Sequence, residues 1–399
     1  MSPTAALVAL NFFLADVQGG LGPFLATWLA TTGWDPERIG LVMTISGLAS
    51  LVFNSPAGVL IDRTCRFRLW VAIASLAVVL GTLATLPARS FAAVLAAQMA
   101  SAVGGALMAP SVTALTLGIV GKDRFPHQLG RNQAWNHAGN VIAAVLVAAA
   151  TFATGPTSAF WVLAGMAAGS AATLLAIPAK AIDPQRARGH GVAAPSASYR
   201  QMLGNRPLLV LGLVLLLFHL GNAAMLPMLG QRMAQFGQGD ATRWMAACVI
   251  VAQLTMVLVA LVSGRMADRI DRVWLLLAAC CVLPLRGAMA ALAQDPIWLI
   301  PIQMLDACGA GTLGVVVPIL VADFTWGTGR TQSALGFVAT LQGIGAACST
   351  TLGGVLAAQF GWAPAFLGLA VPAGFAVALA IRLLGQASSA NAAAISLRV

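Results

Sequence analysis

Long apolar stretches that are nearly free of charge constrain this chain more than any other feature of its sequence. Leu69–Pro87 and Leu208–Pro227 are two examples, and similar stretches recur along all 399 residues. A helix crosses a hydrocarbon layer of about 30 Å with about 20 consecutive apolar residues. Only 9% of the residues are charged, against about 25% in soluble domains. We therefore expect an all-α membrane protein.

Twelve of these stretches predict twelve transmembrane helices in two six-helix bundles. One long polar segment, residues 181–206, separates six stretches from the other six and is typical of a flexible linker. The expected organisation is an N-terminal bundle at 1–180, a cytoplasmic linker at 181–206, a C-terminal bundle at 207–385 and a short cytoplasmic tail at 386–399. The predicted spans are 4–30, 37–61, 69–87, 91–120, 131–154, 157–178, 207–230, 241–264, 273–293, 296–324, 331–359 and 361–384.

Basic residues indicate the side of the membrane on which each loop lies. The chain has 22 lysines and arginines. If both termini are cytoplasmic, all of these fall in cytoplasmic loops and tails except Arg38, Arg89, Arg232, Arg243 and Arg286, as the positive-inside rule requires. We therefore expect a multi-pass protein of a bacterial inner (cytoplasmic) membrane, in contact with the lipid bilayer. Because the charges are spread over short loops, nucleic acid is not an expected partner.

Motifs of catalysis and of cofactor binding are absent from the sequence. There is no HExxH, no GxSxG and no cysteine spacing typical of a metal site, so neither an enzyme nor a cofactor is expected. The first residues, Met1–Ala6, lack the positive segment of a signal peptide, which predicts an uncleaved first span.

The two halves of the sequence repeat each other. The loop that contains Asp62 recurs around Asp268, and Gln98-Met99 recurs as Gln303-Met304. Pro23 and Pro227 occupy corresponding places near the outer end of the first span of each half. These pairs have an almost constant separation, which favours a duplicated six-helix unit of the kind found in transporters.

A short motif occurs in both of the repeated loops. It reads Gly-x-x-x-Asp-Arg-x-x-Arg, and it resembles the signature of the major facilitator superfamily in the same two loops. The resemblance extends over essentially the whole chain and implies that family's pseudo-symmetric twelve-helix fold, which commonly acts as a monomer. One departure is Cys65, where the family usually has glycine. The first copy consists of Gly58, Asp62, Arg63 and Arg66, and the second of Gly264, Asp268, Arg269 and Arg272.

The residues of this motif can make a contact between helices that forms in one conformation and breaks in another. The glycines permit close helix contact, and the aspartates can accept hydrogen bonds from the positive N-terminal end of a neighbouring helix. The spans that open near Arg330 and Arg131 begin on the same side of the membrane and are the expected partners. The resemblance implies that the motif is a gate that holds the outward-open state. The alternative is that its arginines serve only as a positive-inside anchor, which would not explain the aspartate and the glycine.

Polar residues within the predicted spans are candidates for solute binding and proton coupling, since ionisable groups at membrane depth are costly. By resemblance, the first, fourth, seventh and tenth spans line the central cavity. Each of these spans carries polar residues at middle depth: Asp16, Gln18, Gln98, His219, Asn222, Gln303 and Asp306.

Asp16 is the first candidate for proton coupling, because a low-dielectric surrounding favours the neutral form of a carboxyl group and so permits its loading and unloading. Gly19, Gly20, Gly22 and Pro23 follow it and could let the helix bend. The alternative is that Asp16 makes only an interhelical hydrogen bond. Asp306 and His219 are further candidates, and for His219 a satisfied core histidine is an equal alternative.

Three other polar positions have open interpretations. Arg286 either extends to the membrane surface or forms a structural pair with Asp306, and both are favoured over substrate binding. Asn136, His137 and Asn140 cannot all face one cavity, so some of them are expected at the gate or between the halves. Asp323 is expected near the gate.

The function that these patterns favour is secondary active transport of a small-molecule substrate with protons, as an exporter. Two signatures of drug–proton antiporters are missing: Gln98 stands where the fourth span often has an arginine, and the fifth span lacks Gly-Pro-x-x-Gly-Gly. A proton symporter or facilitator for uptake therefore remains the alternative. A transporter-like sensor is a remote one, because no output domain is visible.

Overall fold

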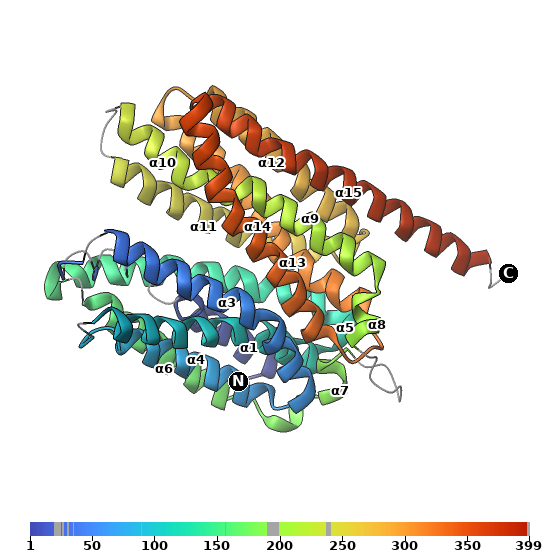
Figure 1. Cartoon of the computed structure of the whole chain (residues 1–399). Helices are drawn as coiled ribbons and strands as arrows, with labels where there is room; N and C mark the ends of the chain where they lie inside the picture. Colours follow the sequence, from blue (N-terminus) through green and yellow to red (C-terminus); the bar gives the residue numbers. More distant parts are fainter. Residues whose placement is uncertain are drawn as a thin grey trace. The chain divides into compact units, whose positions relative to one another are not determined.

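A computed structural model describes residues 1–19, 25, 28–29, 32–34, 36–88, 90–155, 157–189, 199–236 and 241–396. In these ranges the chain is built of helices without strands (Figure 1). The predicted bend at Gly20, Gly22 and Pro23 lies outside the described residues, as do Arg89, Arg398 and residues 190–198 of the predicted linker.

The helices follow the twelve predicted spans closely. The first half contains α1 (Pro3–Gly19), α3 (Pro36–Thr64), α4 (Phe67–Leu83), α5 (Phe91–Thr154), α6 (Ser158–Leu175), η1 (Ala179–Ala181), α7 (Pro184–Ala187) and α8 (Tyr199–Leu203). The second half contains α9 (Arg206–Asn222), α10 (Met225–Phe236), α11 (Ala241–Met266), α12 (Arg272–Leu292), η2 (Pro296–Trp298), α13 (Leu299–Thr325), α14 (Thr331–Phe360) and α15 (Trp362–Ser396).

Nine helical stretches of the described residues are long and apolar enough to cross a membrane, and Pro3–Gln18 and Phe67–Leu83 are shorter apolar helices. One of the nine, Phe91–Ala150, holds two of the predicted spans because α5 is broken at Gly121. That residue has φ 71° and ψ 175°, a conformation that glycine adopts without a Cβ clash. The predicted twelve-span, all-α architecture is therefore confirmed, with the fourth and fifth spans joined directly at Gly121.

The first compact unit comprises Met1–Ala197 together with Thr325–Phe337. Its core lies where α1, α3, α4 and α6 pack against the long α5. Leu7, Leu10 and Leu14 of α1 are fully buried there. Thr325–Phe337, which contains the N-terminal turns of α14, groups with this unit although it belongs to the second half of the sequence.

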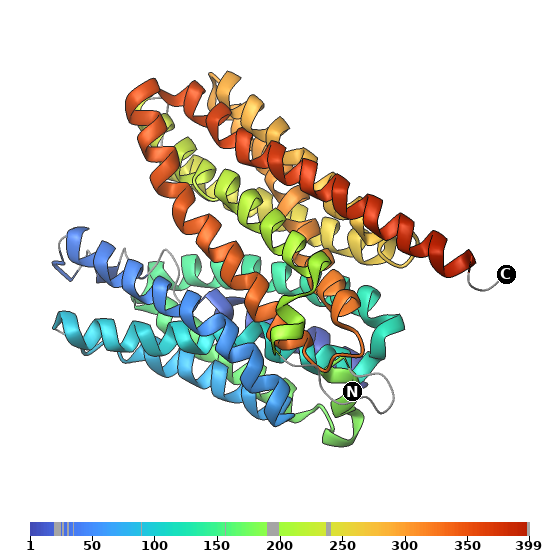
Figure 2. The same ribbon diagram turned by 45° about the vertical axis from the view of Figure 1, so that its right-hand side comes forward.

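The second unit comprises Ser198–Phe324 and Val338–Val399. Within it, α15 packs against α9 and α12, and α12 and α15 lie side by side in both views (Figures 1 and 2). The predicted span 207–230 is divided by a turn at Ala223–Ala224 into α9 and the start of α10. Helix α15 continues beyond the predicted span to Ser396, so the described part of the predicted tail is helical.

The described start of the predicted linker packs on the first unit. Asp183 caps α7 by accepting hydrogen bonds from the N–H groups of Gln185 and Arg186, and its own N–H donates to the carbonyl oxygen of Gly118 at 3.0 Å. Ala187 is fully buried. Residues 182–187 therefore pack on α5.

Candidate functional site

Asp62 of the first motif lies at the N-terminus of α14. Its carboxylate is fully buried and accepts hydrogen bonds from the Ser333 N–H and the Ser333 hydroxyl, both at 2.7 Å, and from the Gln332 N–H at 3.3 Å. The first N–H groups of a helix have no partner within it and form its positive end, so a carboxylate there is doubly favourable. The helix that opens near Arg330 is thus the partner of Asp62.

Gly58 and Cys65 give the first motif its local shape. A Cβ atom at Gly58 would overlap the backbone of Gln332, so only glycine permits this approach of α3 to α14. Cys65 has φ 53°, the left-handed conformation that usually requires glycine. The loop therefore keeps a glycine-like turn despite the cysteine, at a cost in backbone strain. Arg63 and Arg66 on either side are exposed.

The linker residues next to α7 reinforce the same helix end. The Gln332 side-chain amide donates to the carbonyl oxygen of Ala187 at 2.9 Å, and the Gly327 N–H donates to the carbonyl oxygen of Gly189 at 2.6 Å. The positive charge of Arg188 attracts the Asp62 carboxylate. Asp62 and residues 187–189 therefore hold the start of α14 together.

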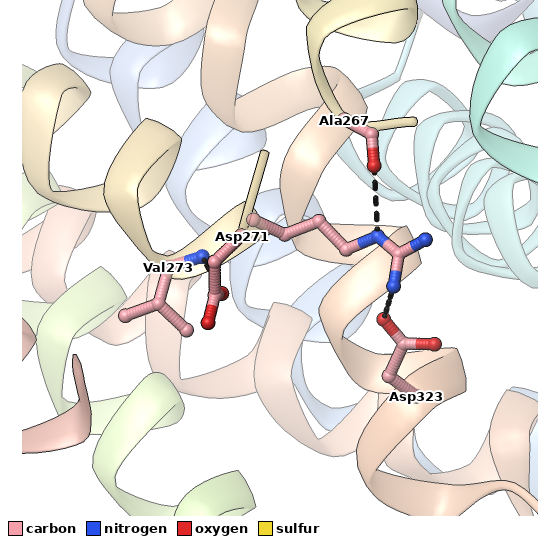
Figure 3. Close-up of polar contacts among 5 residues, drawn as sticks. Ala267, Asp271, Val273 and Asp323 are labelled. Carbon is pink, nitrogen blue, oxygen red and sulfur yellow. Dashed lines mark hydrogen bonds and ion pairs between the residues drawn. The ribbon is translucent and has the colours of Figure 1, made fainter. Parts of the chain in front are cut away.

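The second motif has a different environment. Gly264 is buried, whereas Asp268 and Arg269 are exposed. Figure 3 shows the contact made by Arg272, whose guanidinium donates to the carboxylate of Asp323 at 2.9 Å and to the carbonyl oxygen of Ala267 at 3.1 Å. This arginine links the start of α12 to the inner end of α13, close to the gate position predicted for Asp323. Arg131 of the first unit is exposed, and Arg330 is partly buried.

A buried arginine organises the polar residues of the second unit. Arg286 of α12 is 1% exposed and forms an ion pair with Asp306 at 2.9 Å. It also donates to the side-chain oxygen of Asn222 at 2.5 Å and to that of Gln303 at 2.9 Å. We call these four residues the Arg286 cluster. Of the two interpretations offered for Arg286, the structure shows the pair with Asp306 and not the extension to the surface, and the partners on α9 and α13 compensate the cost of burying the charge.

His219 lies one turn before Asn222 on α9. Its Nδ1–H donates to the carbonyl oxygen of Leu215 at 2.9 Å, and the ring is in electrostatic range of Asp306. A carbonyl oxygen only accepts, so this bond fixes Nδ1 as the donor. Of the residues predicted from the seventh and tenth spans, three therefore surround Arg286, and His219 is adjacent to them.

Asp16 and Gln18 lie near the end of α1 in the first unit. Asp16 is partly buried, and its carboxylate forms no hydrogen bond or ion pair with any described residue. Gln18 is exposed and accepts a hydrogen bond from the Asn136 side chain at 3.2 Å. On α5, Gln98 has a buried side-chain nitrogen that forms no hydrogen bond with a described residue.

A series of buried amides on α5 was not predicted. Gln128 donates to Asn132 at 2.8 Å, Asn132 donates to the hydroxyl of Thr116 at 3.0 Å, and Asn136 donates to the carbonyl oxygen of Asn11 on α1 at 3.1 Å. The signal in the sequence is their spacing of four residues, which places them on one helix face. Asn136 thus joins α5 to α1 within one unit, so it is not one of the residues expected at the gate or between the halves.

Comparison with known proteins places these features in a family. The sequence matches the profile of the Major Facilitator Superfamily over residues 4–282 and 211–397. It is 40% identical over 378 residues to uncharacterized MFS-type transporters of Mycobacterium tuberculosis, strains CDC 1551 and H37Rv, covering 92% of this chain and 90% of each relative.

Solved structures of low sequence identity have the same fold. The transporter FucP in an outward conformation has a TM-score of 0.76 at 15% identity, covering 96% of this chain and 99% of that chain. A variant of the Escherichia coli fucose:proton symporter FucP gives 0.74 at 15%, covering 96% and 98%. The human organic anion transporter MFSD10 gives 0.68 at 17%, covering 95% and 100%. The chain belongs to the Major Facilitator Superfamily of membrane transporters.

Proposed function

We propose that the protein is a secondary active transporter that exports a small organic solute by alternating access, with proton coupling through Asp16. The observation that carries the proposal is the state of the Asp16 carboxylate, which is partly buried in a span and has no partner among the described residues. An ionisable group in such a position is a functional candidate by default. Asp306, the other membrane carboxylate considered, is already engaged by Arg286.

In this proposal the two motifs form a cytoplasmic gate. The hydrogen bonds of Asp62 to the start of α14 are contacts that one state of a transport cycle can make and another can break. We assign this role to both copies of the motif and to the basic residues near their expected helix partners. The residues concerned are Gly58, Asp62, Arg63, Arg66, Gly264, Asp268, Arg269, Arg272, Arg131 and Arg330.

The proposed setting is the inner membrane of a bacterium, with both termini in the cytoplasm and the protein acting as a monomer. The distribution of basic residues between the loops supports this orientation. The FucP likeness, at 15% identity, supports the fold.

Uptake by proton symport is a second candidate. It is favoured by Gln98, which cannot titrate, and by the missing Gly-Pro-x-x-Gly-Gly signature in the fifth span. Export by antiport moves protons in the direction opposite to the solute, whereas uptake by symport moves them together with the solute. The proton movement that a solute gradient drives therefore distinguishes the two.

The test uses everted membrane vesicles with an acidic interior and a dye that reports the pH gradient. A panel of solutes is added to wild type, to Asp16→Asn and to Asp295→Asn. Asp295 is an exposed carboxylate outside the helices, so its variant controls for the same chemical change. We expect one solute to dissipate the gradient with wild type and the control but not with Asp16→Asn.

Three other outcomes count against parts of the proposal. Dissipation that persists in Asp16→Asn would remove Asp16 from the coupling mechanism. Labelled solute that enters intact cells together with protons would replace export by symport. Transport that no pH gradient affects would remove proton coupling.

A further inference from the structure

The Arg286 cluster is electrically balanced. One guanidinium and one carboxylate face each other at 2.9 Å, and the two other members are neutral amides. Arg286 is 1% exposed, so its charge is compensated by the protein and not by water. A solute that meets this cluster meets no net charge.

Arg286 also fixes the orientation of both amides. A guanidinium has only donors, so Asn222 and Gln303 must turn their oxygens toward it. Each amide oxygen is thereby occupied, and each NH₂ group is left as a donor. No described residue accepts a hydrogen bond from either NH₂ group.

Asp306 supplies the complementary acceptor. Its Oδ1 faces Arg286, whereas Oδ2 forms no hydrogen bond with any described residue, and 14% of the side chain is accessible. Gln303 is 1% exposed, so the accessible donor is the NH₂ group of the partly buried Asn222. This donor and the carboxylate acceptor of Asp306 match a chemical group that both accepts and donates hydrogen bonds. Hydroxyl and carboxamide groups do so, while a carboxylate only accepts and an ammonium only donates.

Charged groups fit the cluster poorly for a second reason. An anion would face the like charge of Asp306, which lies 2.9 Å from the guanidinium. A cation would compete with Arg286 for Asp306 and would leave a buried guanidinium without its counter-charge, which is strongly unfavourable. The structure thus disfavours both signs of charge at this place.

We propose that the Arg286 cluster is a solute-binding subsite for a neutral, hydroxyl- or carboxamide-bearing group, and that Arg286 is a positioning residue that orients the groups binding it. This inference rests on the proposed transport function and specifies the class of its solute. It assigns Arg286 a role through Asn222, Gln303 and Asp306, without contact with the solute.

The test measures exchange of labelled compounds by the purified full-length protein in liposomes. The probes are three sets, each with one carbon skeleton in a neutral, an acidic and an amine form. They are glucose, glucuronate and glucosamine; benzyl alcohol, benzoate and benzylamine; and glycerol, glycerate and 3-amino-1,2-propanediol. After subtraction of the passive exchange seen in protein-free liposomes, we expect wild type to exchange the neutral form of at least one set about tenfold faster than its acid or amine, which corresponds to about 1.4 kcal/mol.

Substitutions in the Arg286–Asp306 ion pair test the role of Arg286. If that role were purely structural, they would not change the preference between the neutral, acidic and amine forms. Asp306→Asn leaves the guanidinium unbalanced and should shift the preference toward the acid by about tenfold, and Arg286→Gln should shift it toward the amine. The double variant Arg286→Gln/Asp306→Asn carries neither charge and should keep the neutral preference, even if a single variant fails to fold. Asp295→Asn, which neutralises an exposed carboxylate outside the helices, should leave the relative preference unchanged.

The outcomes separate this inference from the proposed function. Preferential exchange of an acid or an amine by wild type would overturn the neutral subsite and leave transport intact. A charge preference that is the same in all variants would overturn the role of Arg286. Exchange of no compound by folded protein would count against transport itself, and the subsite would fall with it.

Discussion

Replacing Asp62 by asparagine should loosen the start of α14. The carboxylate accepts three hydrogen bonds from Gln332 and Ser333 and is fully buried. Asparagine keeps one acceptor oxygen, places an NH₂ group against a donor and removes the negative charge from the helix N-terminus. A hydrogen bond to a charged group contributes about 1.5–3 kcal/mol, and a charge at a partly buried helix end contributes up to about 2 kcal/mol. Because these contributions overlap, we expect a loss of about 3 kcal/mol.

Hydrogen exchange measures this loss where it occurs. If the start of α14 opens locally, about 3 kcal/mol lowers the protection of the amides of residues 332–337 by about a hundredfold. Asp268→Asn is the matched control, since it makes the same change in the second motif at an exposed carboxylate and should alter stability by less than about 0.5 kcal/mol. Unchanged protection in Asp62→Asn, or an equal fall in Asp268→Asn, would refute the argument that Asp62 stabilises this helix end.

Three other substitutions follow from the described contacts, and thermal unfolding in detergent measures each. Cys65→Gly should raise stability by about 0.5–1 kcal/mol because glycine relieves the strain at φ 53°, and a lower unfolding temperature would contradict this. Asn132→Leu should cost about 2 kcal/mol because the buried amide of Gln128 loses its 2.8 Å hydrogen bond and keeps only a 3.5 Å one to the carbonyl oxygen of Thr4; a neutral effect would mean that the longer bond suffices. Arg272→Gln should cost about 1 kcal/mol or less, because its pair with Asp323 is 33% and 20% exposed; a loss above about 3 kcal/mol would show that exposure does not weaken this pair.

The buried arginine shows where reasoning from the sequence reached its limit. The sequence placed Arg286 in a span and offered two interpretations, extension to the surface or pairing with Asp306. Periodicity could not separate them, since the choice depends on which face of α12 meets α9 and α13. The three contacts of Arg286 decide it.

The amides of α5 show a different limit. Gln128, Asn132 and Asn136 are readable in the sequence as polar residues four apart, yet their partners lie on α1 and on the preceding part of α5. A spacing reveals that residues share a helix face, but it does not reveal which helix that face meets.

The sequence by itself determined the membrane class, the helical spans, the duplicated halves and the two motifs. These follow from local physics: apolar length sets a span, and a fixed spacing of glycine, aspartate and arginine specifies a loop. Only the tertiary structure decided that Asp62 binds the start of α14, that Cys65 adopts a glycine-like turn and that Arg286 orients three polar side chains. The contacts of Asp62 and of Arg286 depend on the distance between segments far apart in the chain, which close packing fixes and local sequence does not.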